Sequence, residues 1–218
     1  MSRRRASRSV QLLSAVGAML AGVLQPALSH AVEINLATMN CARYENDMLQ
    51  SNLPGYTTDP IDTVMWLFGY SVAKSGDRVM YGDSLRAYGF ALDSECKSNP
   101  SSSLLVAATT VKSKRDNPMD LTRLDCATFE TRHQNLRKAD PESAATLTMW
   151  MFGYAVGLSG SHVLDAGLLE KFDSSLGDHC AQHPQDSLFD ALSSANAAVP
   201  GLPLNPVPKP APKAAAKH

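Results

Sequence analysis

The chain has 218 residues, and its 20 lysines and arginines nearly balance 21 aspartates and glutamates, for a formal net charge of −1. It has no basic patch interleaved with aromatic residues, which argues against a nucleic-acid partner. Beyond the N-terminal region no apolar stretch reaches the roughly 18 residues that a membrane-spanning helix needs. We therefore expect a protein that has neither a nucleic-acid partner nor, once its leader is removed, an integral membrane span.

Residues 1–31 have the pattern of a secretory signal peptide. Arginines at positions 3, 4, 5 and 8 precede an apolar stretch from Val10 to Leu24, which is short and rich in Gly and Ala. We expect cleavage after Ala31, with Ser29 as a second option and an uncleaved anchor as the alternative. The sequence thus predicts a periplasmic protein. Cleavage leaves 16 basic against 21 acidic residues, so the mature chain carries a formal charge of −5.

Two copies of one pattern follow. Residues in 66–104 recur at a constant offset in 150–188, without a gap: Trp66, Phe68, Gly69, Tyr70, Ser75, Gly76, Val79, Leu85, Leu92, Cys96, Pro100 and Leu104 become Trp150, Phe152, Gly153, Tyr154, Ser159, Gly160, Val163, Leu169, Leu176, Cys180, Pro184 and Leu188. Upstream, Cys41-Ala42 recurs as Cys126-Ala127. Self-similarity of this kind indicates a tandem repeat.

The repeat sets the expected domain boundaries. We predict repeat 1 at residues 32–111 and repeat 2 at residues 119–199, joined by a charged linker at 112–118 that is too short to let the repeats separate far. Residues 200–218 are rich in Pro, Ala and Lys, a composition typical of a disordered, solvated tail. Because each repeat is too small to hide its apolar helices alone, we expect the two to pack together as an intramolecular pseudo-dimer.

Each repeat is predicted to be helical. Asp59-Pro60 and Asp140-Pro141 are typical of an N-cap followed by proline in the first turn, and Gly76 and Gly160 are suited to the left-handed residue that ends a helix. Helices carrying the two Trp-x-Phe-Gly-Tyr segments should lie between these signals. The predicted fold class is all-α, with two tandem small helical domains.

A second helix in each repeat should begin near Asp83 or Asp165. Its apolar positions follow helical spacing, which places the late cysteine on the buried face. These positions are Leu85, Tyr88, Leu92 and Cys96 in repeat 1 and Leu169, Phe172, Leu176 and Cys180 in repeat 2. Short last helices are expected around Leu104 and Leu188, and no strand-like alternation of useful length is present.

The four cysteines favour disulfides within the repeats. Cys41 and Cys96 lie about 55 residues apart, as do Cys126 and Cys180, and export exposes them to an oxidising compartment. Four cysteines allow three connectivities, so crossed pairings stay open, but the repeat favours Cys41–Cys96 and Cys126–Cys180. A loop of this length stabilises a small domain by roughly 4 kcal/mol in the chain-entropy model.

The sequence gives little support for metal, cofactor or catalytic chemistry. His179, Cys180 and His183 could share a helix face, but an oxidised Cys180 cannot coordinate a metal, and repeat 1 has Glu95 and Asn99 in place of the histidines. Neither a phosphate-binding loop nor a nucleophile elbow is present, and no carboxylate pair recurs in both repeats. We predict no catalytic residues, no metal, no cofactor and no enzyme activity. The aromatic segments favour core packing, with Gly69 and Gly153 marking the close approach of another helix.

The chain resembles the HdeA/HdeB family of periplasmic acid-stress chaperones once in each repeat. The resemblance is carried by the early cysteine, the Trp-x-x-Gly-Tyr segment, a Gly-x-x-Val turn and a leucine helix that ends in Cys and then Pro. It covers most of residues 36–195 and is closer in repeat 2, where Ser161-His162-Val163-Leu164-Asp165 leads into Leu169. The family's single-domain members are dimers at neutral pH, so the fusion of two copies is a departure.

This resemblance implies a holdase, a chaperone that loosens in acid and binds unfolded or acid-denatured periplasmic proteins on exposed apolar surface. With all carboxylates protonated and the five remaining histidines charged, the mature chain would carry about +21 on its side chains, which favours loosening. The expected client-binding residues are Trp66, Phe68, Tyr70, Leu85, Tyr88, Trp150, Phe152, Tyr154, Leu169 and Phe172. The alternatives are a binding module active at neutral pH, such as a toxin-neutralising immunity protein, and a structural envelope protein.

Overall fold

Residues 34–48, 60–81, 84–111, 118–164 and 166–198 are described by the computed structural model, and helices dominate these ranges. The elements in chain order are β1 Ile34–Asn35, a 3₁₀ turn Leu36–Thr38, α1 Cys41–Arg43, a π-helix Tyr44–Met48, α2 Pro60–Lys74, β2 Val79–Tyr81, α3 Leu85–Ser98, α4 Leu104–Thr110, β3 Pro118–Asp120, α5 Cys126–Ala139, α6 Pro141–Ser159, β4 Val163–Leu164, α7 Ala166–Gln182 and α8 Leu188–Ala198. These residues all belong to one unit, residues 31–218. The predicted signal peptide and the tail at 200–218 lie outside the described residues.

The ends of the long helices follow the sequence signals. Proline opens both α2 and α6, and the Asp140 side chain accepts a hydrogen bond from the Ser143 N–H at the start of α6 (3.1 Å). At the other ends, Gly76 and Gly160 have φ of 76° and 77°, a left-handed conformation that glycine adopts without steric cost.

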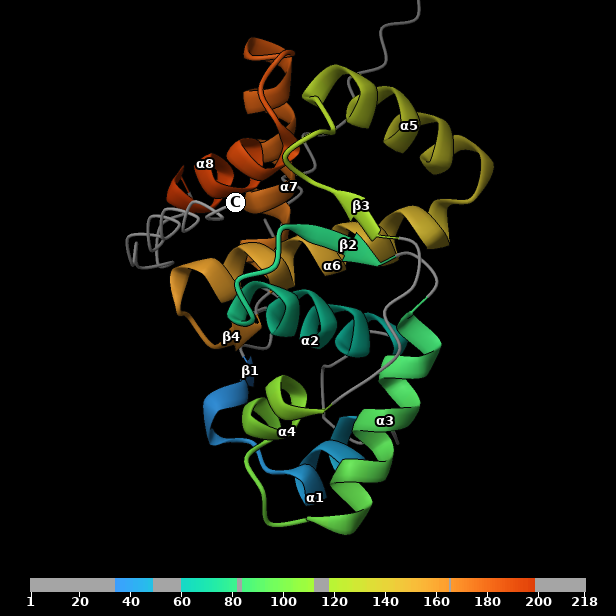
Figure 1. The fold of residues 1–218 in the computed structure, drawn as a ribbon, viewed down its shortest axis with the longest axis vertical. Helices are drawn as coiled ribbons and strands as arrows, with labels where there is room; N and C mark the ends of the chain where they lie inside the picture. The colour runs from blue at the N-terminus through green and yellow to red at the C-terminus, as the bar shows by residue number, and fades with distance from the viewer. Residues whose placement is uncertain (1–33, 49–59, 82–83, 112–117, 165, 199–218) are drawn as a thin grey trace, which may run out of the picture. The chain divides into compact units, whose positions relative to one another are not determined.

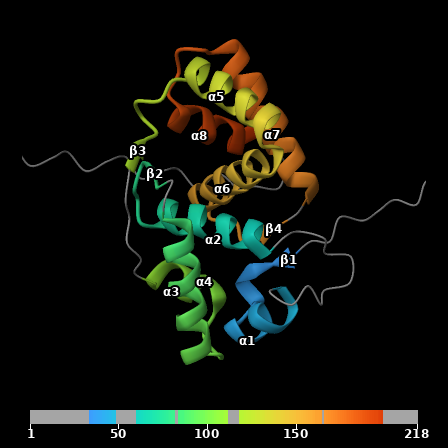
Figure 2. The same cartoon turned by 90° about the vertical axis from the view of Figure 1, so that its right-hand side faces the viewer.

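Helices α2 and α6 lie side by side at the centre of the arrangement (Figure 1). Figures 1 and 2 both show α1, α3 and α4 on the α2 side of this pair and α5, α7 and α8 on the α6 side. We call residues 34–111 the first half and residues 118–198 the second half. The two halves therefore pack on one another through α2 and α6, as expected for the repeats.

Four short strands, which the sequence reading missed, tie the halves together. β1 pairs antiparallel with β4, and β2 pairs antiparallel with β3. Each pair joins one strand of the first half to one of the second, so the N-terminal strand of each half lies against the other half. These strands have two or three residues, too few for an alternating pattern to be read from the sequence.

The all-α fold class with one disulfide in each half is confirmed. Cys41 is bonded to Cys96 and Cys126 to Cys180, with Cα–Cα distances of 4.8 Å and 5.0 Å. The backbone around the two bridges repeats as well. The Cys41 N–H donates to the Ser102 carbonyl and the Cys126 N–H to the Asp186 carbonyl, both at 2.9 Å.

Candidate functional site

The closest contact between the halves is the packing of α2 against α6, which we call the seam. Gly69 of α2 faces the backbone of Trp150, and Gly153 of α6 faces the backbone of Trp66. A Cβ atom on Gly69 would also lie 2.8 Å from the Tyr154 nitrogen, closer than any real side chain tolerates. The predicted close approach at these two glycines is therefore confirmed, and the neighbouring helix belongs to the other half.

The aromatic residues expected to bind clients form the core of the protein. Trp66 and Phe152 have no exposed surface, and the most exposed of the eight aromatic residues, Tyr70, has 3%. Leu85 and Leu169 are partly buried against the same core. In the folded state the eight aromatic residues thus offer almost no surface, and only loosening of the helices can make it available.

The aromatic core repeats between the halves. The Trp66 and Tyr70 rings stack with centroids 5.3 Å apart, and the Trp150 and Tyr154 rings do the same at the same distance. Further out, Phe68 packs on Tyr88 of α3, and Phe152 packs on Phe172 of α7. Each seam helix therefore joins the other half on one face and its own leucine helix on the other.

Two tyrosine hydroxyls reach across the halves. The Tyr154 hydroxyl donates to the Asp77 carbonyl at 2.8 Å, and the Tyr70 hydroxyl lies 3.1 Å from Nδ1 of His162. Burial raises the pKa of both tyrosines. Burial, followed by the positive charge of Lys74, lowers the pKa of His162.

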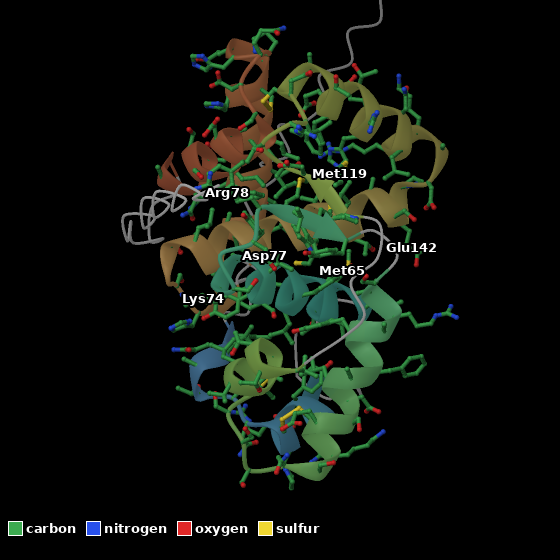
Figure 3. The ribbon with its side chains drawn as sticks, in the orientation of Figure 1. Met65, Lys74, Asp77, Arg78, Met119 and Glu142 are labelled. Carbon is green, nitrogen blue, oxygen red and sulfur yellow. A yellow bond between two sulfur atoms is a disulfide. The ribbon has the colours of Figure 1, made fainter. Side chains whose placement is uncertain are left out.

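Charged side chains flank these cross-half bonds. Figure 3 labels Lys74, the last residue of α2, and Asp77 and Arg78, which lie between α2 and β2. The Arg78 guanidinium lies over the Phe189 ring of α8, 4.3 Å from its centroid, and the Lys74 ammonium lies 5.5 Å from the Tyr70 ring centroid. The turn after α2 thus contacts the second half through both polar and apolar groups.

Three aspartates in the second half have lowered pKa values because hydrogen bonds stabilise their charged form. Asp120 accepts from the hydroxyl and N–H of Thr122, Asp125 from the Thr128 N–H, and Asp140 from the hydroxyl and N–H of Ser143. A lowered pKa contributes stability that is present at neutral pH and lost as the pH falls through the folded-state value.

Glu45 in the first half shows the opposite behaviour. Its pKa is raised, first by burial and then by the neighbouring Asp93 carboxylate, while Lys97 lowers it. Protonation of Glu45 therefore favours the folded state. Sequence reasoning missed Asp120, Asp125 and Glu45, although Asp125, directly before the first cysteine of the second half, carries the signal of a helix N-cap.

The described residues offer neither a metal site nor a membrane-spanning segment. No cluster of three or more His, Cys, Asp or Glu side chains in these ranges is arranged to hold a metal ion, and none of their helices is long and apolar enough to cross a membrane. Cys180 is in a disulfide, and Nε2 of His179 lies 3.1 Å from an Asp186 carboxylate oxygen. The disulfides fit an oxidising compartment.

The sequence model of the HdeA/HdeB family matches residues 104–190, which span α4 and most of the second half. This match supports the resemblance found in repeat 2. No curated protein and no solved structure matches the chain.

Proposed function

We propose that this protein is a periplasmic acid-stress chaperone, a holdase that loosens at low pH and holds unfolding proteins on its exposed core. The observation that carries the proposal is the match of residues 104–190 to the HdeA/HdeB family, whose members act in this way. In this view, the second half is the copy that the family model recognises, and the first half is a more diverged copy of the same domain fused in front of it. The signal peptide delivers the chain to the periplasm. No catalytic role is proposed.

The arrangement of the core supports this function. The aromatic side chains that would bind clients are buried in the folded protein, so in this state they offer almost no surface to a client. Protonation of Asp120, Asp125 and Asp140 in acid weakens the fold, since the stability that each ionised carboxylate contributes through its hydrogen bonds disappears. The two disulfides do not titrate and keep the loosened chain compact.

Positive charge supports it further. As carboxylates are protonated, lysines and arginines keep their charge, and mutual repulsion loosens the packing while keeping the chain soluble. Apolar area then becomes available for clients, whose own cores are exposed by the same acid.

The test is suppression of aggregation of an unrelated acid-labile protein, measured by light scattering at about pH 3 and at pH 7. We expect protection in acid only, together with a rise in apolar dye binding. Equal protection at both pH values, or none at either, would contradict the proposal. A fixed interface at neutral pH would instead favour the binding-module alternative, which predicts no need for acid.

A further inference from the structure

The two halves use different residue types for the same polar contacts. Asn40 and Asp125 each stand directly before the early cysteine of their half and cap the helix that follows. The Asn40 side-chain oxygen accepts from the Arg43 N–H at 2.9 Å, and that of Asp125 accepts from the Thr128 N–H at 2.7 Å. The geometry is the same, but only the aspartate can be protonated.

A second pair repeats this difference. Asn35 and Asp120 stand at the same distance before the early cysteines. The Asn35 side-chain oxygen accepts from the Ala37 N–H at 3.0 Å, and that of Asp120 accepts from the Thr122 N–H at 2.9 Å. The two turns of the first half have amide acceptors, which acid does not change. The two turns of the second half have carboxylate acceptors, which lose their negative charge in acid.

The contacts that follow these turns also differ. In the second half, the Arg137 guanidinium of α5 donates to both carboxylate oxygens of Asp173 in α7 at 2.8 Å, an ion pair that joins the two helices. The position matching Asp173 in the first half is Gly89. There the π-helix contacts α3 through Glu45, which lies beside Asp93 and Lys97, and protonation of Glu45 relieves the repulsion between the carboxylates.

Helix α5 has few apolar anchors. Its buried residues are Cys126, Phe129 and His133. The His133 ring stacks on Phe129, and its Nε2 lies 3.2 Å from the Thr148 hydroxyl of α6 in a site that is only 4% exposed. Two of the three buried side chains that hold α5 in place are therefore a cysteine and a polar ring.

The charged groups around α5 come from its own helix and from its neighbours. Glu130 and Arg137 of α5 and Asp173 and Asp178 of α7 line the opening beside His133. Asp62 and Glu170 join Arg137 and Asp173 around the opening between α6 and α7. Arg123 and Arg78 lie near Asp120, and Arg132 lies near Asp125. Protonation of Asp120 and Asp125 removes the negative charge that faces Arg123, Arg78 and Arg132.

We propose that acid releases α5 from α6 and α7 while the matching segment of the first half, residues 41–47, stays folded, so that the second half supplies the first surface for clients. This regulation rests on the proposed chaperone function. The Cys126–Cys180 disulfide keeps the released helix tethered. Its departure uncovers apolar side chains on the elements beneath it, among them Met149 of α6 and Leu176 of α7, which line the openings beside α5.

The experiment follows backbone amide resonances of the isotope-labelled full chain, with both disulfides intact, from pH 7 into acid. We expect α5 resonances to leave their native positions at a higher pH than those of residues 41–47. In D120N/D125N, the α5 midpoint should move to lower pH. In the matched variant N35D/N40D, the midpoint of residues 41–47 should move to higher pH. Asn and Asp are equally good N-caps, so both variants should fold at neutral pH.

Simultaneous loss of both segments, earlier loss of residues 41–47, or midpoints that do not respond to the exchanges would overturn the proposed order. The aggregation assay separates this outcome from failure of the chaperone proposal. Ordered release of α5 without client protection would refute the chaperone function and uphold the order of opening. Client protection without ordered release would uphold the chaperone function and refute the order of opening.

Discussion

At the scale of single residues, the glycines of the seam set how closely the halves approach. Replacing Gly69 or Gly153 with alanine would force a methyl group into the backbone of the opposite helix. Each variant should lose about 3 kcal/mol of unfolding free energy, since overpacking that only backbone movement can relieve costs at the upper end of the usual range. Urea unfolding at pH 7 measures the loss.

Gly177 of α7 is the matched control for these substitutions. A Cβ atom at this helical position would meet nothing within 4 Å. Gly177→Ala should therefore leave stability unchanged or raise it by about 0.5–1 kcal/mol, through the lower conformational entropy of the unfolded chain. A similar loss at all three glycines would show that the seam is no tighter than the rest of the fold.

His162 gives the cross-half contacts a pH dependence of their own. Its pKa is lowered by burial and then by Lys74, so it contributes stability above its unfolded pKa that is lost as the pH falls through the folded value. We expect His162→Gln to flatten the change in urea midpoint between pH 7 and about pH 5, the range in which histidine titrates.

Lys74→Gln provides a second measurement for the same residue. Removing the ammonium should raise the pKa of His162, observed by NMR of its ring protons, and reduce the slope only in part because burial remains. An unchanged pKa in this variant would mean that Lys74 does not act on His162.

At the scale of helices, much of the fold could be predicted from the sequence. Asp140-Pro141, Gly76 and Gly160 defined helix ends, and the spacing that ends in Cys96 and Cys180 placed both disulfides correctly. These signals are local, since caps and left-handed turns depend on a few neighbouring residues. The internal repeat strengthened these predictions, because each helix-end signal and each cysteine of one half has a counterpart in the other half.

The pairing of β1 with β4 and of β2 with β3 could not be read in the same way. These strands are short and gain their partners only when the halves meet, so no local pattern records them. The same reason explains why the packing of the aromatic residues across the two halves could not be predicted. The aromatic spacing indicated a core, and only the structure shows that the core of each half continues into the other half.

The disulfides are the strongest constraint on the outer helices. Replacing Cys126 and Cys180 together with alanine should cost about 2–4 kcal/mol in urea unfolding at pH 7, because the unfolded chain regains the entropy of a long loop. The Cys41–Cys96 disulfide closes a loop of nearly the same length, so replacing both of its cysteines with alanine should cost a similar amount. A loss in only one of them would mean that native packing, rather than loop entropy, sets the effect.

At the scale of the whole molecule, the pairing of strands between the halves makes each half incomplete by itself. Residues 32–111 would lose the partners of β1 and β2, and residues 119–199 those of β3 and β4, along with the opposite face of the seam. Expressed separately, each half should be unfolded or self-associated, and mixing the two should restore helical signal in circular dichroism. Two stable monomers without mutual affinity would contradict this expectation.

Fusion also changes how the proposed acid switch depends on protein concentration. In a dimer of separate chains, dissociation is favoured by dilution, so the acid midpoint moves with concentration. Here the seam joins two parts of one chain, and their covalent connection holds them at high effective concentration. Tryptophan fluorescence measures the acid midpoint of the full chain, and we expect this midpoint to stay constant over a dilution of about a hundredfold. The mixed separate halves are the control, and their midpoint should rise on dilution. A concentration-dependent midpoint for the intact chain would mean that the functional seam lies between two chains rather than within one.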